Sequence, residues 1–225
     1  MKSSKKRIFA IGDIHGCAKT LTHLLFNVLH ITIDDLIYFL GDYIDRGPDS
    51  KGVIDTILAL QRNAYSVKCV RGNHEDLFIE SDNSPSAFAI FIQNGGKTTL
   101  KSFKISSYKE LPHNYMQFFE STKSHFIEKN FILTHAGLDF ERNDIFVNTE
   151  AMMWSRGFDR HQPKLGNRYL IHGHTPMLLE TIVQQNQNCI NIDAGCVFNG
   201  KNNIKGYLVA LDLINAKYHS VERLD

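Results

Sequence analysis

The chain has 225 residues, which is enough to bury a sizeable hydrophobic core without disulfides or a structural metal ion to reinforce it. Charged residues make up 22% of the sequence and the formal net charge is +1, so the charge balance gives no argument for a nucleic-acid partner. No repeat, low-complexity tract or linker divides the sequence, and we expect one domain spanning residues 1–225.

The N-terminal sequence MKSSKKR is basic, but the apolar stretch after it, residues 8–11, is far too short for a signal-peptide core or a membrane span. The four cysteines are scattered and form no CxxC pair that would predict a zinc site or a disulfide framework. We therefore expect a frayed N-terminal start, reduced thiols, a cytoplasmic location and no membrane partner.

The first third of the chain alternates apolar runs with helical patterns. Strands are predicted at residues 7–12, 35–41 and 64–72, and helices at residues 17–30 and about 50–62. This β-α-β-α-β order predicts parallel strands that are joined by crossover helices. In open sheets of this kind, ligands bind beyond the carboxyl ends of the strands.

The middle segment, about residues 76–124, has a largely helical pattern, and the NGG sequence at 94–96 is expected to end one of its helices. After this segment the pattern changes to strands. They are predicted at residues 125–137, 167–176, 180–185, 189–195, 205–213 and 217–223. Together these elements predict a chain of the α/β class.

Five predicted strands end in short polar sequences that contain glycine: GDIHG (12–16), GDYIDRG (41–47), RGNHE (71–75), THAG (134–137) and HGHTP (172–176). These sequences supply carboxylate, amide and imidazole donors and no thiolate, a set that suits Mn²⁺, Fe or Zn²⁺ better than copper. The donors outnumber what one tetrahedral ion needs, so two ions are implied. The predicted ligands are Asp13, His15, Asp42, Asn73, His135 and His174.

The residue types at these strand ends indicate phosphoryl chemistry. A carboxylate such as Asp42 can bridge two metal ions roughly 3.5–4 Å apart, an arrangement that clamps the attacking and leaving oxygens in phosphoryl displacement. Arg46 and Arg71 lie beside ligand-bearing residues, and a planar guanidinium holds phosphate oxygens in a bidentate manner. His74 is the natural proton donor to a departing alkoxide, because imidazole titrates near neutral pH, and Asp45 could orient it.

In this order and spacing, GDIHG, GDYIDRG, RGNHE, THAG and GHTP resemble the signature of the PPP-type serine/threonine phosphoprotein phosphatases of the calcineurin-like metallophosphoesterase superfamily. The match spans about residues 12–195, and its short loops are more similar to bacterial and bacteriophage members than to eukaryotic ones. The resemblance implies a layered α/β fold with a central β-sandwich of mixed sheets flanked by helices. It also implies hydrolysis of phosphomonoesters on phosphorylated proteins or peptides, by direct attack of a hydroxide that bridges two divalent ions.

The resemblance also assigns roles to individual residues. The ions, with Mn²⁺ expected and Fe or Zn²⁺ as alternatives, would be held in two sets: Asp13, His15 and Asp42, then Asp42, Asn73, His135 and His174. The general acid would be His74, paired with Asp45. The phosphate would be bound by Arg46, Arg71 and, from MWSRG (153–157), Arg156.

Some assignments have alternatives. Trp154 and Arg156 could cover a sheet edge, because arginine stems often pack on apolar surface. His172 lies two residues before His174, so both would share one face of a strand and either could reach a metal ion, although the GHTP resemblance favours His174. The sequence IDAGCVFNG (192–200) follows the phage and bacterial types and lacks the tyrosine-bearing loop of eukaryotic members, so substrate reach cannot be carried over.

Two other functions compete with the phosphoprotein phosphatase. A symmetric dinucleoside-tetraphosphate hydrolase of the same superfamily would cleave a phosphoanhydride. The pair Asp45 and Arg46 argues against it, because that relative typically lacks the acidic residue there, and no nucleotide-binding insertion is visible. A catalytically silent binding module would be expected to lose ligands, whereas every expected ligand and acid is present.

Overall fold

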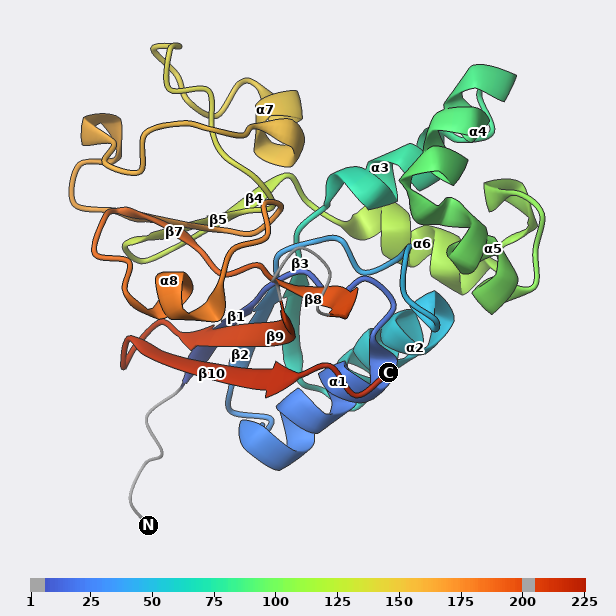
Figure 1. The fold of residues 1–225 in the computed structure, drawn as a ribbon, viewed down its shortest axis with the longest axis horizontal. Coiled ribbons are helices and arrows are strands. Elements are labelled where there is room, and N and C mark those ends of the chain that lie inside the picture. Colours follow the sequence, from blue (N-terminus) through green and yellow to red (C-terminus); the bar gives the residue numbers. More distant parts are fainter. Residues whose placement is uncertain (1–6, 200–204) are drawn as a thin grey trace.

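The computed structural model describes residues 7–199 and 205–225. The frayed start expected for residues 1–6 lies outside this range. Figure 1 shows the strands gathered in the left and central parts of the molecule and a group of helices, α3 to α6, to their right. The predicted α/β class with mixed sheets flanked by helices is confirmed.

The larger sheet is built on the predicted β-α-β-α-β segment. Its strands run in the order β10-β9-β1-β2-β3, and β8 pairs with β9. The strands β1, β2 and β3 are parallel, as predicted, while β9 is antiparallel to β1. These strands are β1 (Ile8–Ile11), β2 (Leu36–Phe39), β3 (Ser66–Cys69), β8 (Ala194–Asn199), β9 (Lys205–Asp212) and β10 (Lys217–Glu222). The crossover helices are α1 (Ala18–His23), continued by the π-helical turn η1 (Leu24–Val28), and α2 (Ser50–Arg62).

The smaller sheet has the order β4-β5-β6-β7. Its strands are β4 (His125–Glu128), β5 (Phe131–Thr134), β6 (Tyr169–His172) and β7 (Cys189–Asn191). Residues 125–137, predicted as one strand, form the hairpin β4–β5, because Lys129 turns the chain with a left-handed φ of 52°. The strand predicted at 180–185 is wrong. These residues lie in and after the helix α8 (Leu179–Val183), which buries Ile182, and so short an apolar run does not distinguish helix from strand.

The helical prediction for the middle segment is confirmed. It contains α3 (Asn73–Glu80), α4 (Pro85–Phe91), η2 (Ile92–Gly96), α5 (Lys97–Phe103), η3 (Tyr108–Glu110) and α6 (His113–Ser121). Gly95 of the NGG sequence has a φ of 106°, which glycine adopts without steric cost, and it breaks the helical path before α5. Within residues 7–199 and 205–225, no helix is both long and apolar enough to cross a membrane.

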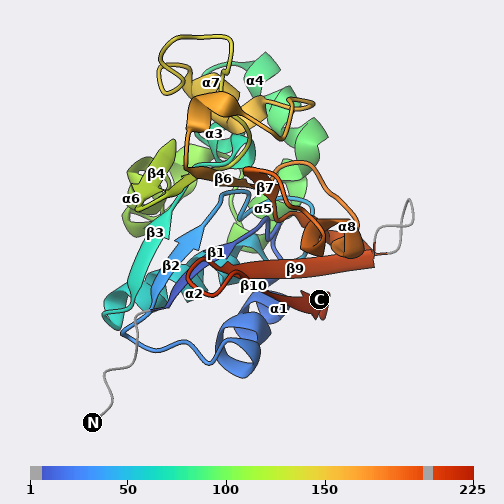
Figure 2. The ribbon, with the colours of Figure 1, turned by 90° about the vertical axis from the view of Figure 1, so that its left-hand side faces the viewer.

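Alternating side chains on the strands build the core on both faces of each sheet. In β1, Phe9 and Ile11 pack with the helices, whereas Ala10 packs with Leu133 and Ile171 of the smaller sheet. This period of two is what a strand that is buried on both faces requires. The two sheets therefore face each other across a shared apolar layer, which is consistent with their stacked positions in Figure 2.

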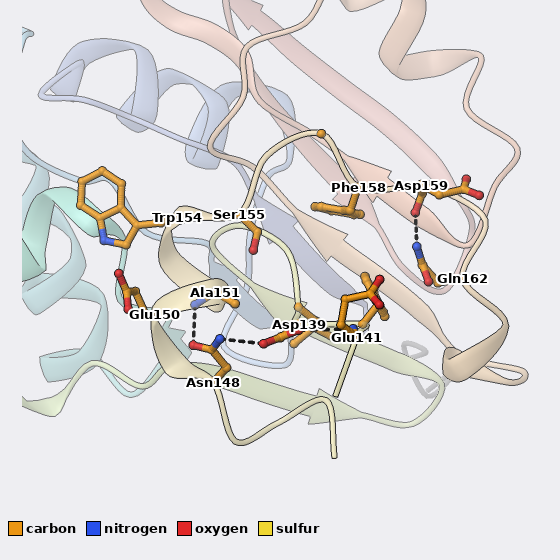
Figure 3. Close-up of a pocket in the computed structure, with 13 residues that line it drawn as sticks. Asp139, Glu141, Asn148, Glu150, Ala151, Trp154, Ser155, Phe158, Asp159 and Gln162 are labelled. Carbon is orange, nitrogen blue, oxygen red and sulfur yellow. Dashed lines mark hydrogen bonds between the residues drawn. The ribbon is translucent and has the colours of Figure 1, made fainter. Parts of the chain in front are cut away.

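The outer face of the smaller sheet is covered by the segment that joins β5 to β6. This segment contains α7 (Thr149–Trp154) and η4 (Pro163–Leu165). Met152 and Leu165 pack there on Ile132 and Leu170 of the sheet. A cavity of about 660 Å³ opens between α7 and residues 155–162 (Figure 3).

An aromatic cluster anchors α3 to the rest of the helical segment. The buried ring of Phe78 stacks on Phe91 with ring centroids 4.9 Å apart, and it meets Tyr108 and Phe119 edge-on. We predict that Phe78→Ala lowers the free energy of unfolding by about 3–5 kcal/mol, because it removes a buried ring and leaves a cavity. Phe78→Leu should cost less than half as much. Urea denaturation measures both, and a loss below about 1 kcal/mol for Phe78→Ala would contradict the packing account.

Candidate metal centre

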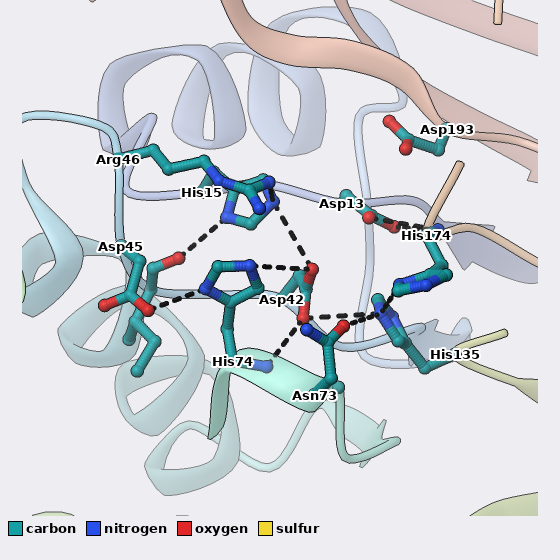
Figure 4. Close-up of polar contacts among 12 residues, drawn as sticks. Asp13, His15, Asp42, Asp45, Arg46, Asn73, His74, His135, His174 and Asp193 are labelled. Atoms are coloured by element: carbon teal, nitrogen blue, oxygen red, sulfur yellow. Dashed lines mark hydrogen bonds and ion pairs between the residues drawn. The ribbon is translucent and has the colours of Figure 1, made fainter. Parts of the chain in front are cut away.

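The polar sequences that follow β1, β2, β3, β5 and β6 converge on one buried cluster (Figure 4). Parallel strands bring their carboxyl ends to the same edge, which explains the meeting of the first three and of the last two. The chain turns sharply at this edge. His15, Asp42 and His174 have φ values of 48°, 50° and 72°, a left-handed conformation that is uncommon for residues other than glycine. Such strained residues cluster at functional sites.

Asp42 is the centre of the cluster. One of its carboxylate oxygens lies 3.3 Å from Nε2 of His15, and the other lies 3.4 Å from Nε2 of His135. His135 Nε2 is in turn 2.9 Å from Oδ1 of Asn73 and 3.0 Å from Nδ1 of His174. Five of the six predicted ligands therefore form one continuous group of donor atoms around a single carboxylate.

The sixth predicted ligand, Asp13, joins the cluster from the other side. Its carboxylate oxygens accept hydrogen bonds from the backbone N–H of His174 at 3.2 and 3.1 Å. Glycine at position 72 permits the close packing of two of these polar sequences, because a Cβ there would collide with the Asp42 carboxylate.

Two groups of donor atoms are compact enough to hold an ion, and they share Asp42. His15, Asp42 and His74 place one donor atom each within 4.8 Å of one another, and Asp42, His135 and His174 do the same. A shared carboxylate between two donor groups is the geometry expected of a two-ion site. The first group includes His74 where the prediction has Asp13, so the division of ligands between the ions stays a prediction.

The imidazoles are oriented as metal ligands require. Nδ1 of His15 lies 2.8 Å from the carbonyl oxygen of Ile44, and Nδ1 of His135 lies 3.0 Å from that of Leu40. A carbonyl only accepts, so each Nδ1 carries the hydrogen and each Nε2 lone pair points into the cluster. Burial lowers the pKa of His15 and of His135, and it lowers the pKa of His174 to about 3, which keeps all three rings neutral.

The buried carboxylates fit a site for divalent cations. Burial raises the pKa of Asp13 well above its usual value, and the nearby Asp193 raises it further. Burial likewise raises the pKa of Asp193 to about 7, with Asp42 adding to the rise. Burial also acts upward on Asp42, but the positive charge that the surrounding histidines carry when protonated outweighs it and lowers the pKa of Asp42 below the usual range. Negative charge gathered in a buried place is costly unless cations or donors compensate it.

Asp193 was not among the predicted site residues. It is 2% exposed, and Figure 4 shows it beside Asp13. The sequence did contain a signal, because DAG at 193–195 lies just beyond the end of β7, as the other polar sequences lie just beyond their strands.

Glu75 was also missed, although it belongs to RGNHE. Its buried carboxylate accepts hydrogen bonds from the backbone N–H groups of Asp42, Tyr43 and Gly72 at 2.8, 2.9 and 3.0 Å. It thereby fastens the loop after β2 to the start of α3. A glutamate at the third position of a helix that bonds back to the N-cap is half of a capping box, and that pattern could have identified it.

His74 and Asp45 form the predicted pair. Nδ1 of His74 lies 2.7 Å from Oδ2 of Asp45. The other Asp45 oxygen accepts a hydrogen bond of 2.6 Å from the hydroxyl of Thr99, and the backbone N–H of Asp45 donates to Thr99 and to Ser50. Among the residues the structure describes, Nε2 of His74 has no hydrogen-bond partner, and it lies 3.9 Å from Asp42. The general-acid prediction requires a ring with one nitrogen held in place and the other free to donate toward the cluster, and His74 has both.

Two of the three predicted phosphate-binding arginines lie at the cluster. The guanidinium of Arg46 donates to Nε2 of His15 over 2.7 Å. Arg156 is exposed, and its guanidinium donates to the hydroxyl of Thr175, the neighbour of His174, over 3.3 Å. Both side chains stand where they could meet an anion that approaches the cluster.

Arg71 has other partners. Its Nε donates to the hydroxyl of Thr122 at 2.9 Å, and Nη2 donates to the carbonyl oxygens of Phe119 and Glu120. These contacts tie Arg71 to the end of α6. These contacts do not favour a role for Arg71 in binding phosphate. That role stays a prediction.

His172, the alternative metal ligand, is 6% exposed. Its Nδ1 lies 3.1 Å from the carbonyl oxygen of Gly173, and its ring lies 5.3 Å from that of Phe158, at the cavity described above. Burial lowers its pKa to about 4. Neither of the two compact donor groups contains His172.

The role of Thr99 in holding Asp45 can be tested by mutation. We predict that Thr99→Val lowers kcat on an alkyl phosphoester about tenfold with little change in KM, because a hydrogen bond to a charged group contributes about 1.5–3 kcal/mol. Thr99→Ser keeps the hydroxyl and should restore kcat. Steady-state kinetics of both variants, after denaturation curves show that each is folded, decides the matter. A valine variant with kcat within twofold of the native value would show that Thr99 does not position Asp45.

Comparison with known proteins agrees with the geometry. Residues 6–178 match the family described as calcineurin-like phosphoesterase. The chain is 28% identical over 226 residues to bis(5'-nucleosyl)-tetraphosphatase PrpE [asymmetrical] of Oceanobacillus iheyensis, an alignment that covers 87% of this chain and 86% of that protein. It is 38% identical over 91 residues to serine/threonine-protein phosphatase 1 of Salmonella typhimurium, covering 40% of this chain and 39% of that one.

A solved structure described as a putative diadenosine tetraphosphatase has the same fold. It superposes with a TM-score of 0.68 at 19% identity, covering 100% of this chain and 97% of that chain. The family match extends over most of the chain and includes the donor groups that meet at Asp42. This chain therefore belongs to the calcineurin-like phosphoesterase family.

Proposed function

We propose that this chain is a metal-dependent hydrolase of dinucleoside tetraphosphates that cleaves its substrate asymmetrically. The main support for this proposal is the similarity of the chain, over 87% of its length, to a relative named as an asymmetrical bis(5'-nucleosyl)-tetraphosphatase. The sequence motifs alone favour the phosphoprotein phosphatase over a tetraphosphatase, which they suggest in its symmetric form. Similarity along nearly the whole chain outweighs the presence of the pair Asp45 and Arg46, which favours the phosphoprotein phosphatase.

The side chains of the cluster suit this reaction. Divalent ions held around Asp42 would neutralise phosphate charge and activate water. Arg46 and Arg156 would bind phosphate oxygens and keep the polyphosphate in line for attack. Cleavage of a phosphoanhydride releases a weakly basic phosphate, so the leaving group needs little help from a proton donor.

The proposal also includes the identity and number of the metal ions and the place where the protein acts. Mn²⁺ is the ion we propose, because oxygen and imidazole donors surround the site and thiolates do not. The two donor groups that share Asp42 support the binding of two ions. We also propose action in the cytoplasm on a soluble substrate, without a nucleic-acid or membrane partner.

The products of diadenosine tetraphosphate test the proposal. We predict that Mn²⁺-loaded protein yields ATP and AMP in equal amounts, which anion-exchange chromatography resolves. Asp42→Asn should abolish cleavage, whereas Asp34→Asn, an exposed acid that precedes β2 at the end of the strand opposite to Asp42, should not. Two equivalents of ADP would contradict asymmetric cleavage, and an uncleaved substrate would contradict the proposal as a whole.

A phosphoprotein phosphatase is the second candidate, and the pair of His74 and Asp45 favours it. A serine or threonine alkoxide is a strong base that leaves poorly without a proton, and the free Nε2 of His74 beside the cluster could supply one. The partial similarity to serine/threonine-protein phosphatase 1 supports the same candidate. Its partner would be a phosphorylated protein or peptide.

One variant separates the two reactions. We predict that His74→Asn lowers kcat on a phosphoserine peptide by about 10² or more, the usual contribution of a positioned acid, and lowers kcat on diadenosine tetraphosphate much less. Steady-state rates on both substrates with the same protein preparation measure the contrast. Unchanged turnover of the phosphoserine peptide would refute the acid role of His74.

A further inference from the structure

The cavity between α7 and residues 155–162 adjoins the metal centre through one short segment. Trp154, Ser155, Gly157 and Phe158 line the cavity. Arg156, in the middle of this segment, instead donates to Thr175 beside the cluster. The indole ring of Trp154 also lies 6.2 Å from the ring of His174. A ligand with a phosphate group at Arg156 would therefore have its next portion at the mouth of the cavity.

The walls of the cavity are acidic. Asp139, Glu141, Glu150 and Asp159 line it, and within the described parts of the chain its lining contains no lysine or arginine (Figure 3). Asp139 is paired with Arg142, but no hydrogen bond occupies the carboxylates of Glu141 and Glu150 among the described residues. Like charges repel, so this cavity disfavours phosphate and favours a neutral or cationic group that donates hydrogen bonds.

The cavity also has an aromatic floor. The ring of Phe158 is half-buried and lies 5.7 Å from the ring of Phe140, and both line the cavity. Phe158 is held firmly, because it packs on the backbone at Gly137 and on the ring of His172. A rigid aromatic face combined with hydrogen-bond acceptors suits a flat heterocycle that carries amino and hydroxyl groups.

We propose that this cavity binds a purine nucleoside at one end of the polyphosphate substrate. The base would pack on Phe158, and its amino group and the ribose hydroxyls would donate to Glu141 and Glu150. The cavity's volume of about 660 Å³ lies within the usual range of small-molecule sites, about 300–1,000 Å³. The inference rests on the proposed function for the position of the phosphates and adds to it the place where the nucleoside is recognised.

Charge separates the two halves of this composite site. The arginines stand on the side of the metal centre, and the carboxylates stand on the side of the cavity. A dinucleoside tetraphosphate has the same division, with anionic phosphates in the middle and a neutral, donor-rich nucleoside at each end. A peptide rich in lysine would satisfy the carboxylates as well, but it would leave the aromatic floor unused.

Binding to the cavity can be measured without any hydrolysis, because the chain has one tryptophan and it lines the cavity. Adenosine, which has no phosphate, should change the fluorescence of Trp154 in a saturable way. Phe158→Leu should raise the Kd for adenosine at least fivefold, because it removes the aromatic ring on which the base would stack. Phe146→Leu is the matched control, because Phe146 belongs to the same apolar cluster and does not line the cavity.

Steady-state kinetics provide a second test of nucleoside binding in the cavity. Phe158→Leu should lower the ratio of kcat/KM on diadenosine tetraphosphate to kcat/KM on p-nitrophenyl phosphate at least fivefold, and Phe146→Leu should leave the ratio unchanged. An unchanged ratio in Phe158→Leu, with the dinucleotide still cleaved, would overturn the inference and leave the proposed function intact.

Failure of the native protein to cleave the dinucleotide would overturn the proposed function. Saturable adenosine binding would in that case still support the cavity as a nucleoside site. A saturable fluorescence change with a lysine-rich peptide and none with adenosine would assign the cavity to basic peptides and overturn the inference.

Discussion

The contacts of one buried carboxylate, Asp42, organise this structure. Its two oxygens face imidazoles from different sheets, and its backbone adopts a left-handed φ of 50° that turns the chain out of β2 into the cluster. Both compact groups of donor atoms include it. The two sheets and the helical segment act as supports, because they position the polar strand ends around this carboxylate.

The supports are themselves hydrogen-bonded to the loop that carries Asp42. Glu75 at the start of α3 binds two backbone N–H groups of that loop, and Thr99 of α5 binds Asp45 three residues further on. The aromatic cluster around Phe78 then fixes α3 against its neighbouring helices. The middle helical segment thus positions His74, the predicted proton donor, as well as filling space beside the sheet.

The sequence allowed prediction of the parallel strands and of the residues that converge, because both depend on local patterns: apolar runs that end in glycine and polar donors. It did not predict Thr99, whose contact joins residues 54 positions apart, because no local pattern announces a partner at that distance. The short helix that buries Ile182 was mistaken for a strand for a related reason, since packing rather than periodicity decides so short a run. The motifs do not decide between the two substrate classes, because under the proposal above that choice would depend on the cavity walls near Phe158, which are built by a loop without a motif.

The central claim is that two divalent ions share Asp42 inside this cluster. Protein loaded with Mn²⁺ and freed of excess metal can be examined by elemental analysis and electron paramagnetic resonance on the same sample. The account predicts two ions per chain with an exchange-coupled spectrum, because a carboxylate shared by two ions would hold them roughly 3.5–4 Å apart. A single ion per chain, or two ions with the spectrum of isolated Mn²⁺, would contradict it.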